Sequence, residues 1–152
     1  MKTLISILFV SINLACFAQN RKPGVSPVAF PTITINLGGN NGGNIHADSL
    51  SRLVDSALVA RDEKGNRFTI TRFRCIYKFK SYYEDSQTGE LKATDDMRAN
   101  EFRETPTMSE LWRQSIQDNI QPGDEMILDN IIVRLNDGKK IMIAPIRFTV
   151  SK

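Results

Sequence analysis

The chain has little of the chemistry that most enzymes use. Its 152 residues include one histidine, His46, and two cysteines, Cys16 and Cys75. A Ser-His-Asp or Cys-His arrangement would have to be built on His46, and no serine stands in a Gly-x-Ser-x-Gly pattern. A zinc site would need carboxylates for most of its ligands, which is unusual. We therefore predict no catalytic residue, no metal site, no cofactor and no enzyme activity.

Long apolar runs are also scarce, and the longest one opens the chain. Lys2 precedes the apolar residues 4–14, and the small residues of 15–18 then allow cleavage before Gln19. This run is too short to span a bilayer comfortably, and no other segment is apolar enough to do so. We predict a signal peptide over residues 1–18, export to the periplasm and no membrane span.

Cysteine usage leaves one question of anchoring open. Residues 14–16 look like a lipoprotein signal, although Asn13 stands where such signals usually have an aliphatic residue. Lipidation at Cys16 would make the protein an outer-membrane lipoprotein, whereas cleavage before Gln19 would release it. Either way no intrachain disulfide could form in the folded domain, because Cys75 is its single cysteine. Cys75 lies in an alternating apolar series, which predicts a buried thiol.

Charge gives little support for nucleic-acid binding. The chain has 20 basic and 17 acidic residues, a formal charge of +3. The basic residues are scattered, and Arg72, Arg74, Lys78 and Lys80 alternate as on the solvated face of a strand. Nucleic-acid binding needs a clustered basic patch, so we predict no nucleic-acid partner.

Periodicity predicts a mainly β domain of the α+β class, sandwich-like and antiparallel, with one substantial helix. Residues 19–31 are rich in proline and lack periodicity, which is typical of a linker. One domain then covers residues 32–152. Alternating apolar residues predict strands over 33–37, 57–61, 67–80, 126–135, 140–144 and 146–150.

Two local features refine this prediction. The apolar parity shifts inside 67–80, which predicts a bulge near Thr71 and Arg72. Residues 109–120 are the clearest helix, and Thr107 with Glu110 has the spacing of a capping box. The apolar stripe of this helix is expected to hold Met108, Leu111, Trp112, Ile116 and Ile120.

The remaining segments are less regular. Residues 47–54 favour a short helix or turn, and residues 84–103 are typical of an exposed excursion that carries one or two irregular strands. The glycine run 38–43 lacks the lysine of a phosphate-binding loop and predicts tight turns. The adjacent carboxylates Glu84–Asp85 and Asp95–Asp96 are expected to lie in solvent. They leave open the alternative of a small-ligand or glycan binder or, with less support, a hydrolase.

Several segments together resemble one family. The residues that carry the resemblance are GNNGGNI at 39–45, QPGDEMILDNI at 121–131, DGK at 137–139 and APIRFTV at 144–150. Their order and spacing are similar to those of the C-terminal periplasmic domain of GldM/PorM-type proteins of gliding motility and type IX secretion. The similarity covers residues 31–152.

The resemblance implies a non-enzymatic, β-rich module that pairs with itself and reaches outer-membrane ring partners. Members of that family carry an inner-membrane helix and preceding periplasmic domains, whereas here we predict a cleavable signal, so only the docking role carries over. We expect a periplasmic interaction module, an accessory or paralogue of that apparatus. Its expected partners are secretion-ring or motor components, or a second copy in a homodimer. The expected surface contains Tyr82, Tyr83 and Phe102, the large apolar residues of the polar excursion.

Overall fold

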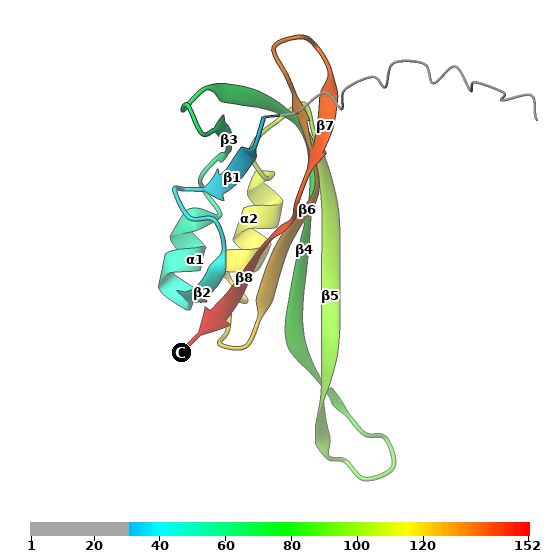
Figure 1. Cartoon of the computed structure of the whole chain (residues 1–152). Helices are drawn as coiled ribbons and strands as arrows, with labels where there is room; N and C mark the ends of the chain where they lie inside the picture. Colours follow the sequence, from blue (N-terminus) through cyan, green and yellow to red (C-terminus); the bar gives the residue numbers. More distant parts are fainter. Residues whose placement is uncertain (1–30) are drawn as a thin grey trace, which may run out of the picture. The chain divides into compact units, whose positions relative to one another are not determined.

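An eight-stranded sheet curls around two helices (Figure 1). The computed structural model describes residues 31–152, which form one compact unit. The predicted signal peptide, nearly all of the predicted linker and Cys16 lie outside the described residues. The strands are β1 (Ile33–Leu37), β2 (Gly43–His46), β3 (Leu58–Asp62), β4 (Arg67–Glu84), β5 (Leu91–Arg103), β6 (Glu125–Arg134), β7 (Lys140–Ile143) and β8 (Ile146–Ser151). The helices are α1 (Ala47–Leu53) and α2 (Glu110–Gln117).

The sheet is antiparallel except at one edge. Its path runs β1-β3-β4-β6-β8-β2, with β5 paired to β4 and β7 paired to β6. The one parallel pair in the described chain joins β2 to β8. The prediction of a mainly β, α+β fold is confirmed. Where the expected sandwich-like domain would have a second sheet, the two helices cover the inner face of the single sheet.

The helices lie side by side and are joined by polar contacts. The Gln117 side-chain amide donates to the Ser51 carbonyl oxygen at 2.9 Å and to the Asp55 carboxylate at 3.0 Å. Leu50 of α1 and Ile116 of α2 are fully buried. The predicted helices over 47–54 and 109–120 are both present, although the second is shorter at both ends.

The core lies between the helices and the inner face of the central strands. Its fully buried side chains come from segments far apart in the sequence. This is the arrangement by which one curled sheet and two helices bury a continuous apolar volume. The largest of them are Phe73, Phe148, Leu37, Leu50, Ile116, Met126, Leu128 and Ile131.

The predicted bulge in β4 is confirmed. The pairing between β4 and β6 shifts register between Ile70 and Arg72 and again between Arg72 and Arg74. Ile70 and Phe73 are both buried although their parity differs. On the opposite strand Asn130 adopts a φ of 51°, a left-handed conformation that asparagine tolerates. The bulge keeps the apolar side chains of both halves of β4 on the inner face.

Two details of α2 differ from the prediction. Ser109 is the N-cap residue and makes no side-chain cap hydrogen bond, while Thr107 bonds with Thr105. The expected capping box of Thr107 and Glu110 is therefore wrong. Leu111 is 81% exposed, so it does not belong to the buried stripe. Helical spacing by itself does not show which side of α2 faces the sheet, and Leu111 lies on the side that faces solvent.

Residues 84–103 are mostly exposed and contain a strand, as predicted, but the strand is long and regular. From Leu91 to Arg103 they form β5, which pairs with β4 over its whole length, from Arg72↔Arg103 to Glu84↔Leu91. The prediction missed the length and regularity of this strand because most side chains of β5 are exposed, so no alternation of apolar and polar residues marks it. Its backbone pairing, rather than burial, defines it as a strand.

The glycine run makes two tight turns and begins β2, a strand that periodicity did not reveal. Gly42 has a φ of +111°, and a Cβ there would lie 2.7 Å from the carbonyl oxygen of Arg147. Gly38 has a φ of +55°, and a Cβ there would meet the Leu53 side chain at 2.4 Å. Close approach of backbone to neighbouring strands and helices thus requires glycine at both positions.

Candidate interaction surface

The most prominent surface feature is a two-stranded ribbon at one end of the molecule (Figure 1). The pairing of β4 with β6 ends at Lys78↔Glu125, whereas its pairing with β5 continues to Glu84↔Leu91. Residues 79–96, which we call the hairpin extension, therefore reach beyond the helices and the other strands. A ribbon of two strands has no core of its own, so most of its side chains are exposed. The exception at its root is Phe79, which stacks on Tyr77 and packs against the core of the body.

The hairpin extension exposes large apolar side chains. Tyr82 is 65% exposed, Tyr83 is 52% exposed and Leu91 is 73% exposed. Successive residues of a strand point to opposite faces, so Tyr82 lies on one face of the ribbon and Tyr83 on the other. Both tyrosines lie at the surface, where the sequence analysis expected them.

Phe102 is not part of this surface. It is 6% exposed, stacks on Phe73 at a ring-centroid distance of 4.9 Å and meets Trp112 edge-on at 6.5 Å. The expectation that Phe102 is a surface residue is therefore wrong. Phe102 lies at the end of β5 that pairs inside the body, where α2 covers the inner face of the sheet.

The hairpin extension is acidic. It contains two lysines and five carboxylates, a formal charge of −3, whereas the rest of residues 31–152 has fifteen basic and twelve acidic side chains. At the turn, the Asp85 carboxylate accepts the backbone N–H groups of Gln87 and Thr88 and pairs with Lys92. The extension therefore combines exposed aromatic rings with an excess of negative charge.

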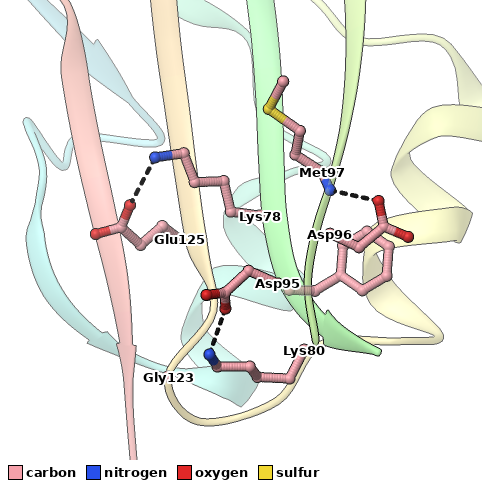
Figure 2. A pocket seen from close by; sticks show the side chains of 8 residues that line it. Lys78, Lys80, Asp95, Asp96, Met97, Gly123 and Glu125 are labelled. Atoms are coloured by element: carbon pink, nitrogen blue, oxygen red, sulfur yellow. Dashed lines mark hydrogen bonds and ion pairs between the residues drawn. The ribbon is translucent and has the colours of Figure 1, made fainter. Parts of the chain in front are cut away.

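A hollow of about 580 Å³ lies at the root of the extension (Figure 2). Its charged side chains pair with one another, Lys80 with Asp95 and Lys78 with Glu125, the latter at 3.6 Å. Asp96 instead accepts the Met97 backbone N–H at 2.7 Å. As neighbours on a strand, Asp95 and Asp96 point to opposite faces. The two carboxylates are not brought together for acid-base chemistry.

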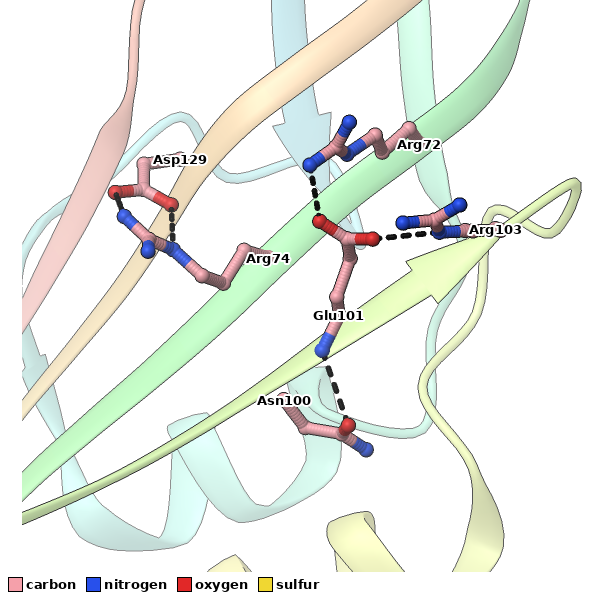
Figure 3. Close-up of polar contacts among 6 residues, drawn as sticks. All are labelled: Arg72, Arg74, Asn100, Glu101, Arg103 and Asp129. Carbon is pink, nitrogen blue, oxygen red and sulfur yellow. Dashed lines mark hydrogen bonds and ion pairs between the residues drawn. The ribbon is translucent and has the colours of Figure 1, made fainter.

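The outer face of the sheet carries a network of ion pairs (Figure 3). The guanidinium of Arg74 contacts both carboxylate oxygens of Asp129, at 2.8 and 2.6 Å. Glu101 of β5 pairs with Arg72 and with Arg103. The sequence analysis had identified the alternating cations of β4 but not the acids opposite them, which come from β5 and β6.

These pairs hold carboxylates in their charged form. Hydrogen bonds from Arg74 lower the pKa of Asp129, and hydrogen bonds from Arg103 and then Arg72 lower the pKa of Glu101. Glu125 similarly pairs with Lys78 and with Arg147, the latter at 2.8 Å. The basic residues of β4 are thus neutralised locally and do not form a basic patch.

A buried polar contact fixes the turn that precedes β6. The Tyr77 hydroxyl donates to the Asp124 carboxylate, which also accepts the Gln121 backbone N–H at 2.8 Å. The Asp124 carbonyl accepts the Val150 N–H at 2.8 Å. Burial, followed by the hydrogen bond to Asp124, raises the pKa of Tyr77. The Pro-Gly-Asp segment therefore ties β4 to β8 at the root of the extension.

Cys75 and His46 lie in different parts of the fold. Cys75 is fully buried in the core, as predicted, and burial raises the pKa of its thiol to about 12. A thiol so far from ionisation is a poor nucleophile. His46 is exposed at the end of β2. The structure does not bring these two side chains into one site.

Two further findings for residues 31–152 concern metal ions and membranes. No group of three or more histidine, cysteine or acidic side chains there could hold a metal ion. None of the helices in the described residues is both long and apolar enough to cross a membrane.

Sequence reasoning missed the exposed Leu91 and Met97 and the acids that pair with the outer-face cations. No apolar alternation marks Leu91 and Met97 in the sequence, and their place became evident only from the pairing of β5 with β4. No family model and no curated protein matches the chain in sequence.

Proposed function

We propose that this chain is a non-enzymatic periplasmic protein-interaction module, an accessory or paralogue of the gliding-motility and type IX secretion apparatus. One observation carries the interaction role: the hairpin extension holds Tyr82, Tyr83 and Leu91 in solvent, and none of these three side chains belongs to the core. Exposed aromatic residues grouped on a projecting element are typical of protein contacts. The assignment to this apparatus rests on the resemblance described above.

The chemistry of the extension defines the partner's surface. Two tyrosines and a leucine need an apolar depression, and a formal charge of −3 favours a basic rim around it. Rings on both faces of the ribbon fit a partner groove that takes in the extension from two sides. A secretion-ring or motor component with such a groove is the expected partner.

A capture experiment tests the proposal. Tagged protein is cross-linked in cells and purified from the envelope, alongside a variant in which Asn-Gly replaces residues 82–93. Ser81 and Thr94 then flank a two-residue turn, which such hairpins accommodate. We expect envelope proteins of the secretion apparatus with the parent chain and their loss with the variant. Leu111→Ser, which alters an exposed leucine on α2, is the matched control and should retain them.

Two outcomes would contradict the proposal. Either no envelope protein is recovered above an untagged control, or the shortened variant recovers the same proteins as the parent. Location is tested separately by mass spectrometry of the purified N-terminus. Cleavage before Gln19 gives a free periplasmic protein, and a diacylglyceryl group on Cys16 gives a lipoprotein. An uncleaved cytoplasmic chain would overturn the assignment to the periplasm.

The hollow at the root of the extension supports the alternative, a small-ligand or glycan binder. Its volume suits a small molecule, but its lysines and carboxylates already pair with one another. A ligand would have to break these pairs. Titration of ¹⁵N-labelled protein with envelope glycan fragments tests this alternative, which predicts shifts centred on Lys78, Met97 and Gly123.

A further inference from the structure

The outer edge of β5 is a long unpaired strand edge. No strand of residues 31–152 pairs with β5 on the side away from β4. The Glu104 N–H donates to the Thr71 carbonyl and the Asp85 N–H donates to the Glu90 carbonyl, both within the register of the hairpin. Even-numbered residues of β5 therefore bond to β4, and odd-numbered residues direct their backbone groups outward.

Two of these outward groups have only local partners. The Met97 N–H donates to the Asp96 side chain at 2.7 Å, and the Glu101 N–H donates to the Asn100 side chain at 3.0 Å. Both acceptors belong to the preceding residue and are exposed. A neighbouring strand could replace them at small cost, because a freed carboxylate or amide returns to water.

A second copy of the chain can pair with this edge only in certain registers. In an antiparallel pair, residues opposite each other must both direct their backbone groups across the pair or both direct them away. Odd-numbered residues of β5 can therefore face only odd-numbered ones. A symmetric pair has its two-fold axis at one residue, and axes at residues 95 to 99 leave nine or more residues paired.

The charged residues of β5 make some of these registers unfavourable and leave others acceptable. An axis at Asp95, Asp96 or Arg98 places that residue opposite its own copy, so that like charges face each other. An axis at Ala99 avoids this but pairs only nine residues. An axis at Met97 pairs all thirteen residues of β5 and places no two like charges directly opposite.

The register centred on Met97 also creates attractive contacts. Asp96 of each copy faces Arg98 of the other as a non-hydrogen-bonded pair, the type in which side chains lie closest. The Met97 side chain, exposed in one copy, faces its own equivalent. The same edge would form two ion pairs and one apolar contact at its centre.

We propose that two copies of this chain associate through β5, antiparallel and edge to edge, with the two-fold axis at Met97. The two hairpins then form one four-stranded ribbon in this region. The pairing does not depend on the function proposed above.

A cysteine cross-link tests the register directly. Protein expressed from its full coding sequence is purified with Met97→Cys or with Ala93→Cys and oxidised. At the axis the two Cα atoms would lie about 5.5 Å apart, within the range that a disulfide spans. The two copies of residue 93 would lie about 27 Å apart. We expect a covalent dimer from Met97→Cys alone, and equal cross-linking of both variants overturns the register.

Charge reversal tests the ion pairs without a covalent bond. The mass in solution, measured between about 1 µM and about 1 mM, should shift from one chain to two for the parent. Asp96→Arg faces Arg98 of the partner and should weaken the dimer at least about tenfold. Arg98→Asp should do the same, and a mixture of the two variants should form a one-to-one dimer. Asp95→Arg, which faces Ala99, is the matched control.

Arg98 also contacts its own chain, at 5.0 Å from the Phe79 ring centroid and 3.0 Å from the Ser115 hydroxyl. If Arg98→Asp lowers the melting temperature, Met97→Pro replaces it in the test. The N–H of residue 97 faces outward, so proline leaves the pairing with β4 intact but blocks strand addition. A parent chain that stays monomeric up to about 1 mM, or a dimer unaffected by Asp96→Arg and Met97→Pro, overturns the proposal.

Discussion

β4 and β5 run from the body of the molecule into the hairpin extension without a break, yet the two halves differ in what surrounds them. Tyr77 and Tyr83 lie on the same strand and the same face. Tyr77 is buried under the helices and bonded to Asp124, whereas Tyr83 is 52% exposed. The difference lies in the layer above the strand, which ends near Phe79. β4 and β5 therefore continue as paired strands beyond the point where the helices cover them and bury their side chains.

The contrast has a consequence for stability and function. In the body, side chains of β4 and β5 contribute to the free energy of unfolding through burial. In the extension the exposed Tyr82, Tyr83 and Leu91 contribute little, so their large apolar side chains have no role in the core of the described chain. The two halves should respond oppositely to mutation, with stability sensitive in the body and binding sensitive in the extension.

The largest expected effect is in the body. Phe73→Ala removes a fully buried ring that stacks on Phe102 and should lower the free energy of unfolding by about 3–5 kcal/mol. Tyr82→Ala, in the extension, should change it by less than about 0.5 kcal/mol. Urea denaturation measures both, and similar losses would contradict the contrast between body and extension.

Gly42→Ala should follow in size. The new Cβ would meet the Arg147 carbonyl oxygen at 2.7 Å, and φ is +111°, so we expect a loss of about 3 kcal/mol. Gly43→Ala has a φ of +98° with open space around the Cβ, and should lose about 1 kcal/mol. Thermal melts of the Gly42→Ala and Gly43→Ala variants compare the two losses. The difference between them measures the effect of the close Cβ contact beyond that of the positive φ. Equal losses would show that the contact does not matter.

Tyr77→Phe tests the polar anchor at the boundary between the halves. Without the hydroxyl the buried Asp124 carboxylate loses one donor, and the free energy of unfolding should fall by about 1–3 kcal/mol. Tyr83→Phe is the matched control and should have no measurable effect. Denaturation of both variants at pH 7 gives the answer. A stable Tyr77→Phe protein would mean that water replaces the hydroxyl.

A smaller effect is expected from pH. Because Arg74 lowers the folded-state pKa of Asp129 below 3.8, the pair stabilises the protein above that value. The contribution is lost as the pH falls toward the folded pKa, and at a solvent-exposed pair it should be less than about 1 kcal/mol. Asp129→Asn should flatten this part of the stability curve between about pH 5 and pH 2. An unchanged slope would show that the pair is neutral in energy.

The smallest effect on stability should come from the largest deletion. Replacing residues 82–93 by Asn-Gly removes most of the extension but nothing from the core, so the free energy of unfolding should change by less than about 0.5 kcal/mol. Chemical denaturation checks this. A loss of several kcal/mol would mean that the extension supports the body and would erase the distinction between the halves.

Much of the fold could be predicted from local sequence. The alternation in 33–37 and 146–150 identified two strands, and the parity shift near Thr71 identified the bulge. These signals exist because each strand packs one face against a core. β2 escaped prediction because it has a single buried residue, Ile45. β5 was expected only as one or two irregular strands, because it is almost entirely exposed. A strand that is held by backbone pairing, with almost no side chain in the core, has no alternation of apolar and polar residues that would identify it in the sequence.

Only part of the candidate surface could be predicted from the sequence. Tyr82 and Tyr83 were correctly expected in solvent, and Phe102 was not. All three lie in or beside a polar segment, and sequence gives no way to tell an aromatic residue beneath α2 from one beyond its end. The unpaired edge of β5 was also invisible, because it depends on the regular pairing of that strand with β4.

Residue type and local spacing were enough to establish the mainly β class, the buried thiol of Cys75 and the scarcity of catalytic side chains. Three other features came from the folded arrangement alone: where the helices stop covering the sheet, which cations meet acids, and which edge is left open. These depend on segments distant in sequence, because burial and pairing are properties of the neighbours that folding brings to a residue.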